Sequence, residues 1–152
     1  MTTPEQEEQE TQEEQEVIEE PQPPLEYQIS FDRIAELKRS AVAIMADRRP
    51  QMSPSRKNPD TELPDAKKLV DEIASNYADD DNFIRTEMPI QEIVFRLLLT
   101  RRNTPTLLSD LHYELTEKWS TPERPINITE EGLTRIMDSD TYYGFVRVEP
   151  KR

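Results

Sequence analysis

The 152-residue sequence contains no cysteine, two glycines and one histidine. Without cysteine the chain cannot form disulfides, iron–sulfur clusters or cysteine zinc sites, and it has no thiolate nucleophile. Gly132 and Gly144 lie twelve residues apart and match no phosphate-binding loop or nucleophile elbow. His112 has no second histidine with which to build a metal site. These absences favour a non-catalytic protein, and we expect no metal or cofactor.

Long apolar segments are also missing. No run approaches the roughly 20 apolar residues that span a bilayer, so we expect no membrane insertion. No apolar stretch follows a basic leader, so the sequence predicts no signal peptide. The lack of cysteine fits a reducing compartment, and we therefore predict a cytoplasmic protein.

Charge is distributed unevenly along the chain. The formal net charge is −13, and the first thirty residues contain ten glutamates with no lysine or arginine. Residues 31–152 carry the other 22 acidic side chains against 19 basic ones, a balance of −3. The acidity therefore belongs to the N-terminal segment, a pattern typical of an interaction protein rather than of an acidic enzyme.

Composition predicts four regions. Residues 1–28 read as a disordered acidic and proline-rich tail, because they offer too little apolar surface to offset chain entropy. Residues 29–50 read as an amphipathic helix and residues 51–63 as a proline-rich linker. Residues 64–152 are expected to form a helical domain. The fold class is therefore mainly α.

Apolar spacing and capping residues place the elements more closely. A first helix is expected over 31–48, capped by Ser30, and a second from Pro64 to Tyr77 or Ala78. A third should open at Pro89, a fourth should run from Thr104 or Thr106 to Trp119, and a fifth should be capped by Thr129 and reach Asp138. The β-forming run 142–148 predicts a final strand.

The order of elements from about residue 88 to 149 resembles a winged helix–turn–helix domain. The residues that carry the resemblance are Ile90, Ile93, Val94, Leu97 and Leu98 for its first helix, Pro105–Leu111 for the turn and second, Thr129, Leu133 and Ile136 for the third, and Phe145–Val148 for a wing strand. A complete wing has two strands joined by a hairpin. The sequence shows one such strand here, and 125–128 or the stretch near Thr104 are the alternatives for its partner.

The resemblance implies a nucleic-acid-binding helix, but the charges oppose this function. The third helix of the unit would present Glu130, Glu131 and Arg135, and lysines or arginines normally supply phosphate contacts. If the region binds DNA, Arg101, Arg102 and Arg135 are the candidate contacts. We hold a DNA-binding regulator as the alternative hypothesis, with nucleic acid disfavoured as a partner.

The favoured hypothesis is a non-catalytic adaptor or accessory subunit that docks on a protein partner, with a nucleic-acid-handling complex as one setting. Its candidate docking residues are Ile34 and Leu37 on the first helix and Tyr143 and Phe145 on the last strand. The pairs Asp138–Asp140 and Ser53–Ser55 have simpler interpretations, as a turn and as an ordinary linker.

Overall fold

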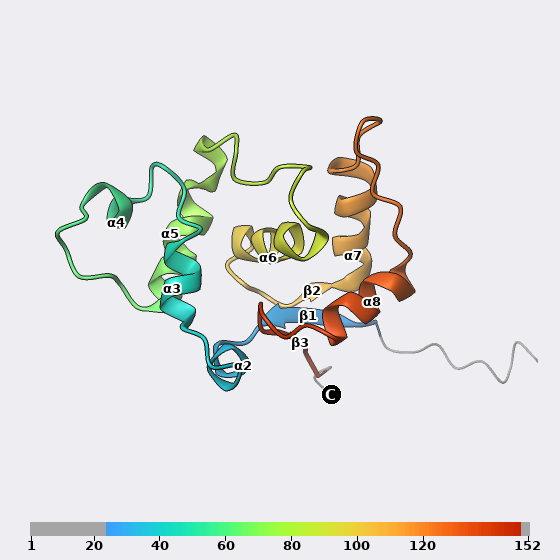
Figure 1. Cartoon of the computed structure of the whole chain (residues 1–152), viewed down its shortest axis with the longest axis horizontal. Helices are drawn as coiled ribbons and strands as arrows, with labels where there is room; N and C mark the ends of the chain where they lie inside the picture. Colours follow the sequence, from blue (N-terminus) through green and yellow to red (C-terminus); the bar gives the residue numbers. More distant parts are fainter. Residues whose placement is uncertain (1–23, 150–152) are drawn as a thin grey trace, which may run out of the picture.

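The computed structural model describes residues 24–149, which fold into helices around a small sheet (Figure 1). The elements in order are β1 Glu26–Ile29, α2 Phe31–Glu36, α3 Ala41–Ala46, α4 Pro54–Lys57, α5 Ala66–Asn76, the 3₁₀ helix η1 Tyr77–Asp79, α6 Ile90–Thr100, β2 Thr106–Leu107, α7 Leu108–Tyr113, the π-helix η2 Glu114–Lys118, α8 Glu130–Asp138 and β3 Phe145–Arg147. The expectation of a mainly α fold is confirmed.

The sheet has three antiparallel strands in the order β2-β1-β3. Tyr27 faces Thr106 on one neighbour and Arg147 on the other, and Ile29 faces Phe145. Tyr27 and Ile29 are buried, so alternate residues of β1 point into the core. The central strand of the sheet therefore comes from the N-terminal side of the chain.

Helix α6 lies in the middle of the molecule, with α3 and α5 to one side, α7 and α8 to the other, and the sheet beneath it (Figure 1). It contacts α5, β1 and η2, while α7 packs on α8 and α8 on β3. Six of its eleven residues are buried, more than an amphipathic surface helix would show. One continuous core follows, which includes side chains from Tyr27 to Phe145.

The predicted tail boundary is wrong at its C-terminal end. Residues 26–28 were assigned to a disordered tail, but they lie in β1, and Leu25 packs against the core. Hydrogen bonds from the backbones of β2 and β3 satisfy both edges of this strand, which composition alone did not reveal. The rest of the predicted tail up to residue 23 lies outside the described residues.

The single helix expected over 29–50 is two short helices. Helix α2 ends in a Schellman motif, in which Arg39 N donates to Ile34 O at 3.1 Å and Lys38 N to Ala35 O at 3.0 Å. Lys38 adopts the left-handed conformation with φ of 64°. Ser40 then caps α3 by accepting from Ala43 N. The apolar spacing correctly predicts helical structure on both sides of Lys38. It does not predict the break between α2 and α3, because a lysine and not a glycine occupies the left-handed position.

Several predicted helix boundaries are confirmed. Helix α5 ends at Asn76 before η1, and α6 begins directly after Pro89. Thr129 caps α8 by accepting from Gly132 N, and the helix ends at Asp138. Helix α5 begins at Ala66 with Asp65 as its cap, so Pro64 lies just before the helix and not in its first turn, and the predicted linker contains the short helix α4.

The predicted fourth helix is wrong at its start. Thr106 lies in β2, so α7 begins at Leu108, and a π-helical turn continues it to Lys118. The final strand pairs with β1, not with 125–128 or the stretch near Thr104. Within residues 24–149, the helices lack the length and apolar character that crossing a bilayer requires.

Candidate partner-binding surface

Two of the four predicted docking residues are core residues. Ile34 is fully buried and Phe145 is 6% exposed, so neither is accessible to a partner in the folded chain. This corrects the prediction that they form a docking face. Leu37 and Tyr143 are half-buried and remain partly accessible.

The burial of Ile34 follows from a close approach between β3 and α2. Gly144 has φ of +81°, and a Cβ built on it would lie 2.6 Å from Ile34 Cγ1. Ser30 N donates to Gly144 O at 2.8 Å, which ties the start of α2 to the turn before β3. Ile34 of α2 therefore packs against the turn before β3 and does not face solvent.

A cluster of tyrosine and arginine side chains lies next to this junction. The guanidinium carbon of Arg39 is 3.9 Å from the ring centroid of Tyr142, and the rings of Tyr142 and Tyr143 meet edge to face at 4.7 Å. We name Arg39, Tyr142 and Tyr143 the Arg39–Tyr142 patch. Arginine and tyrosine are enriched at protein interfaces, which gives this patch the composition of a docking surface.

The patch borders a hollow of about 320 Å³. Gln91 of α6, Ile136 of α8 and the segment 139–143 line it. Partner side chains that dominate binding energy usually insert into such hollows, while the surrounding contacts exclude water. The Arg39–Tyr142 patch therefore has a concave neighbour large enough for one anchoring side chain.

A largely buried network of Glu92 and two arginines binds the hydroxyl of Tyr143. Its hydroxyl donates to Glu92 at 3.1 Å, and Glu92 also accepts from Arg48 and Arg96 at 2.8 Å each. Burial opposes the charge on Glu92, but the hydrogen bonds from the two arginines outweigh it and lower the pKa of this carboxyl. Burial, with the Glu92 charge, raises the pKa of Tyr143 to about 12. Tyr143 is thus held neutral and fixed in one orientation.

Asp140 fixes the loop that carries both tyrosines. Its carboxylate accepts from the backbone N–H groups of Tyr142, Tyr143, Gly144 and Phe145 at 2.8–3.2 Å. Asp138 instead accepts from the Tyr27 hydroxyl and from Arg147. Residues 24–149 hold no group of three or more side chains suited to a metal ion. The contacts of Asp140 fit its interpretation as a turn residue, whereas Asp138 connects the end of α8 to β1 and β3.

The arginines predicted as nucleic-acid contacts do not form a common patch. Arg101 pairs with Glu114 at 3.3 Å, and Arg102 pairs with Asp71 at 3.2 Å and donates to Ser75. Arg135 is exposed on α8, beyond Glu130 and Glu131 at the start of the same helix. The positive charge of the two arginines that follow α6 is therefore paired with acidic side chains within the fold.

Two polar residues of the sequence analysis have structural partners. His112 Nε2 lies 2.6 Å from the carbonyl oxygen of Ile128 and donates to it, because a carbonyl can only accept. Ser53 is fully buried, and its hydroxyl and that of Ser55 donate to Glu72 at 2.7 and 2.6 Å. The linker is thus attached to α5 at two points.

No protein-family model, curated protein or solved structure matches this chain. The function proposed below is therefore argued from the geometry of the described residues. Sequence reasoning missed Arg39 and Tyr142, because they lie far apart in the chain and in elements assigned to different regions. Tyr142 did carry a signal, as one of the aromatic residues next to the predicted strand.

Proposed function

We propose that this chain is a non-catalytic adaptor or accessory subunit that docks on a protein partner through the Arg39–Tyr142 patch. The observation that carries the proposal is the stacking of Arg39 on Tyr142 at 3.9 Å, on a loop held by Asp140. A prearranged patch loses little conformational freedom on binding, so more of its contact energy appears as affinity. Arginine and tyrosine are also the residue types that most often dominate such interfaces.

A protein partner suits the surface charge better than a nucleic acid does. Sequence-independent binding to DNA depends on basic side chains that neutralise phosphates. Arg101 and Arg102 each have an acidic partner in the fold, and α8 opens with two exposed glutamates. Approach of a phosphate backbone to α8 would therefore be repelled.

The winged-helix-like arrangement remains part of the proposal. Its support is the order α6, β2, α7, α8, β3, with β1 lying between β2 and β3. In this proposal β1 supplies the pairing that a wing hairpin would otherwise give to β3. Many winged helices bind DNA, and the DNA-binding regulator accordingly stays as the alternative function, with Arg135 as its exposed candidate contact.

Affinity capture from an extract of the native host, with and without nuclease, tests the proposal. We expect a partner protein whose capture survives nuclease and is weakened at least tenfold by combining Arg39→Ala with Tyr142→Ala, given about 1.4 kcal/mol per factor of ten. The matched control is Tyr113→Ala, because Tyr113 is 66% exposed and lies on α7. Equal loss in the control, or unchanged capture by the double variant, would remove the patch from the proposal.

The alternative function has its own experiment. DNA binding should weaken steeply with salt and fall further on replacement of Arg135 by alanine. A partner retained after nuclease treatment and indifferent to Arg135→Ala supports the adaptor. Capture that nuclease abolishes favours the DNA-binding regulator instead.

A further inference from the structure

Arg39 presents hydrogen-bond donors that no residue of the described chain uses. Its guanidinium carbon lies 3.9 Å from the ring centroid of Tyr142, and the side chain is exposed. Within residues 24–149 this side chain donates to no acceptor and has no carboxylate at ion-pair distance. An arginine carries five N–H donors in a planar fork that matches a carboxylate, and stacking on a ring leaves the edge of the fork free. Arg39 is therefore oriented to bind an anionic group.

The hollow beside the patch favours an apolar side chain. It measures about 320 Å³, and Ile136, Tyr142 and Tyr143 are among the residues that line it. Asp140 also lines it, and its carboxylate accepts from four backbone N–H groups of its own loop. A second carboxylate inside the hollow would be repelled by Asp140. A segment that fits both features has a carboxylate for Arg39 and an adjacent apolar side chain for the hollow.

The sequence before β1 contains this pattern once. Residues 16–20 read Glu-Val-Ile-Glu-Glu, and Val17 and Ile18 are the only valine, leucine or isoleucine residues before Leu25. Glutamates lie on both sides of this pair, and the sequence before Leu25 has no lysine or arginine. The segment therefore complements the patch in charge, through Arg39, and in its one apolar pair.

The segment is long enough to reach the patch. Ile18 lies seven residues before Leu25, and seven residues extend over up to about 25 Å. From Leu25, β1 leads to Ser30 over about 17 Å at the usual rise per residue. Ser30 N donates to Gly144 O at 2.8 Å, next to Tyr143 of the patch. A short tether also holds the segment at a local concentration of about millimolar, so a weak contact is sufficient.

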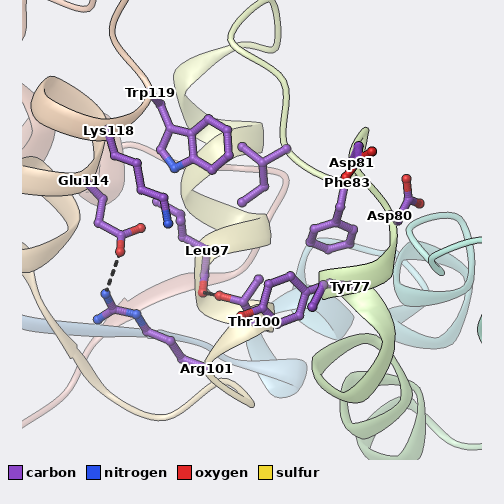
Figure 2. Close-up of a pocket in the computed structure, with 12 residues that line it drawn as sticks. Tyr77, Asp80, Asp81, Phe83, Leu97, Thr100, Arg101, Glu114, Lys118 and Trp119 are labelled. Atoms are coloured by element: carbon purple, nitrogen blue, oxygen red, sulfur yellow. Dashed lines mark hydrogen bonds and ion pairs between the residues drawn. The ribbon is translucent and has the colours of Figure 1, made fainter.

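A second cavity, of about 360 Å³ between η1 and η2, does not suit an acidic segment (Figure 2). Three carboxylates line it, those of Asp80, Asp81 and Glu114. The cations in its lining are Arg101 and Lys118, and Arg101 already pairs with Glu114 at 3.3 Å, as the dashed line in Figure 2 shows. The excess of negative charge repels further carboxylates, so this cavity does not compete with the patch for the segment.

We propose that residues 16–20 of this chain occupy the Arg39–Tyr142 patch, with a glutamate carboxylate accepting from Arg39 and an apolar side chain, Val17 or Ile18, in the hollow. The consequence of the contact rests on the proposed function, because the segment then covers the surface on which the partner docks. An exposed ion pair contributes little to stability. The contact therefore covers the patch reversibly, and a partner that binds the patch more tightly displaces the segment.

A spin label in the full-length chain tests the contact. The sequence has no cysteine, so Gln12→Cys creates a single attachment point for a nitroxide and leaves residues 16–20 intact. The nitroxide broadens the NMR signals of nearby nuclei. We expect the backbone amide signals of Arg39, Tyr142 and Tyr143 to lose intensity relative to the chain with the reduced label. The loss should diminish at about 1 M salt, where the Debye length falls to about 3 Å. An even loss along the whole chain, or no loss at the patch, would overturn the proposal.

Matched variants separate a specific contact from general attraction between charges. Arg39→Ala and Arg56→Ala remove the same charge from exposed side chains, so both variants are expected to fold normally. Arg39→Ala should restore the signal of Tyr142, whereas Arg56→Ala, on α4, should leave the loss unchanged. Val17→Ser combined with Ile18→Ser removes the apolar pair and should also restore the signal. Equal responses to the two arginine variants, or no response to the serine pair, would contradict the proposed contact.

The contact and the proposed function can fail separately. If the label finds the patch but Arg39→Ala with Tyr142→Ala leaves partner capture unchanged, the segment's contact stands and the docking function is wrong. If the double variant weakens capture but the label loses no signal at the patch, the docking function stands and the proposal that residues 16–20 cover the patch is wrong.

Discussion

The side-chain amide of Asn103 pairs with both backbone groups of Ile29. Ile29 N donates to Asn103 Oδ1 at 2.7 Å, and Asn103 Nδ2 donates to Ile29 O at 2.8 Å. The backbone pairing of β1 with β2 stops at Tyr27 and Thr106, so the amide continues the ladder by one further pair. Asparagine tolerates the left-handed conformation that Asn103 adopts, with φ of 58°. A single side chain thus connects the end of α6 to the central strand.

Asn103→Ala should lower the free energy of unfolding by about 1–3 kcal/mol, because two polar backbone groups of the buried Ile29 lose their partner. Denaturant titration followed by circular dichroism measures the change. Asn127→Ala serves as the control, since Asn127 is exposed and should shift stability by less than about 0.5 kcal/mol. Equal effects of the two variants would show that the Asn103 pairing contributes nothing.

Gly144→Ala should be strongly destabilising, by more than about 2 kcal/mol. The added Cβ would lie 2.6 Å from Ile34 Cγ1 and 2.9 Å from Ser30 O, at φ of +81°. Gly132→Ala provides the contrast, because Gly132 is helical and its nearest neighbour would be Thr129 Oγ1 at 3.2 Å. Thermal unfolding of the two variants should differ widely, and similar melting temperatures would argue against the close packing of α2 on β3.

Glu92→Gln should cost about 3–5 kcal/mol, because it leaves the buried guanidinium of Arg48 without its carboxylate. The matched control is Glu87→Gln, because Glu87 and its partner Arg85 are both exposed and the loss of this ion pair should leave the free energy of unfolding nearly unchanged. Urea titrations of both variants measure the difference. A loss no larger than in the control would mean that Glu92 does not organise this part of the core.

The pH dependence of the wild-type chain follows from the same carboxyl group. The arginines lower the pKa of Glu92 in the folded state below its ordinary value of 4.5. The stability that Glu92 contributes is therefore complete above pH 4.5 and is lost as the pH falls through the folded-state pKa. Glu92→Gln should flatten the acid limb of a stability–pH profile. An unchanged acid limb would assign the titration to other carboxyl groups.

Local signals in the sequence predicted most of the helices. The spacing of Ile93, Val94 and Leu97 gave α6, and Thr129 gave the start of α8, because caps and periodicity are encoded within a few residues. The sheet could not be predicted in the same way. The pairing of Tyr27 with Thr106 and Arg147 joins residues far apart in the chain. The residue types of β1 do not indicate which distant segments will pair with it.

The candidate site was predictable only in part. Tyr143 could be chosen because a short aromatic strand often has one accessible face, but the pairing that buries Phe145 depends on β1. The stacking of Arg39 on Tyr142 likewise requires the turn at Lys38. The sequence does not indicate this turn, because a lysine occupies the left-handed position where glycine is usual. Long-range contacts, rather than residue types, determined which side chains stayed accessible.

Two truncations separate the acidic N-terminal segment from the folded unit. Removal of residues 1–20 should leave the melting temperature nearly unchanged, as their composition predicts. Removal of residues 1–29 should abolish cooperative unfolding, because it takes away the central strand and the fully buried Tyr27. Calorimetry on both truncated chains tests this, and a large fall in melting temperature on removal of residues 1–20 would contradict the composition argument.

The break between α2 and α3 can be strengthened by one substitution. Lys38 occupies the position where Schellman motifs usually place glycine, and its φ of 64° costs a residue with a Cβ about 1–2 kcal/mol. Glycine at this position removes the strain, but it also makes the unfolded chain more flexible, which partly offsets the gain. Lys38→Gly should therefore raise the free energy of unfolding by up to about 1 kcal/mol. Lys57→Gly, within helix α4, lacks the compensating strain and should be neutral or destabilising. If Lys38→Gly instead lowers the melting temperature, as a glycine inside a helix would, the chain is one continuous helix over 31–48, as the apolar spacing predicts. The position of Arg39 over Tyr142 then has to be revised.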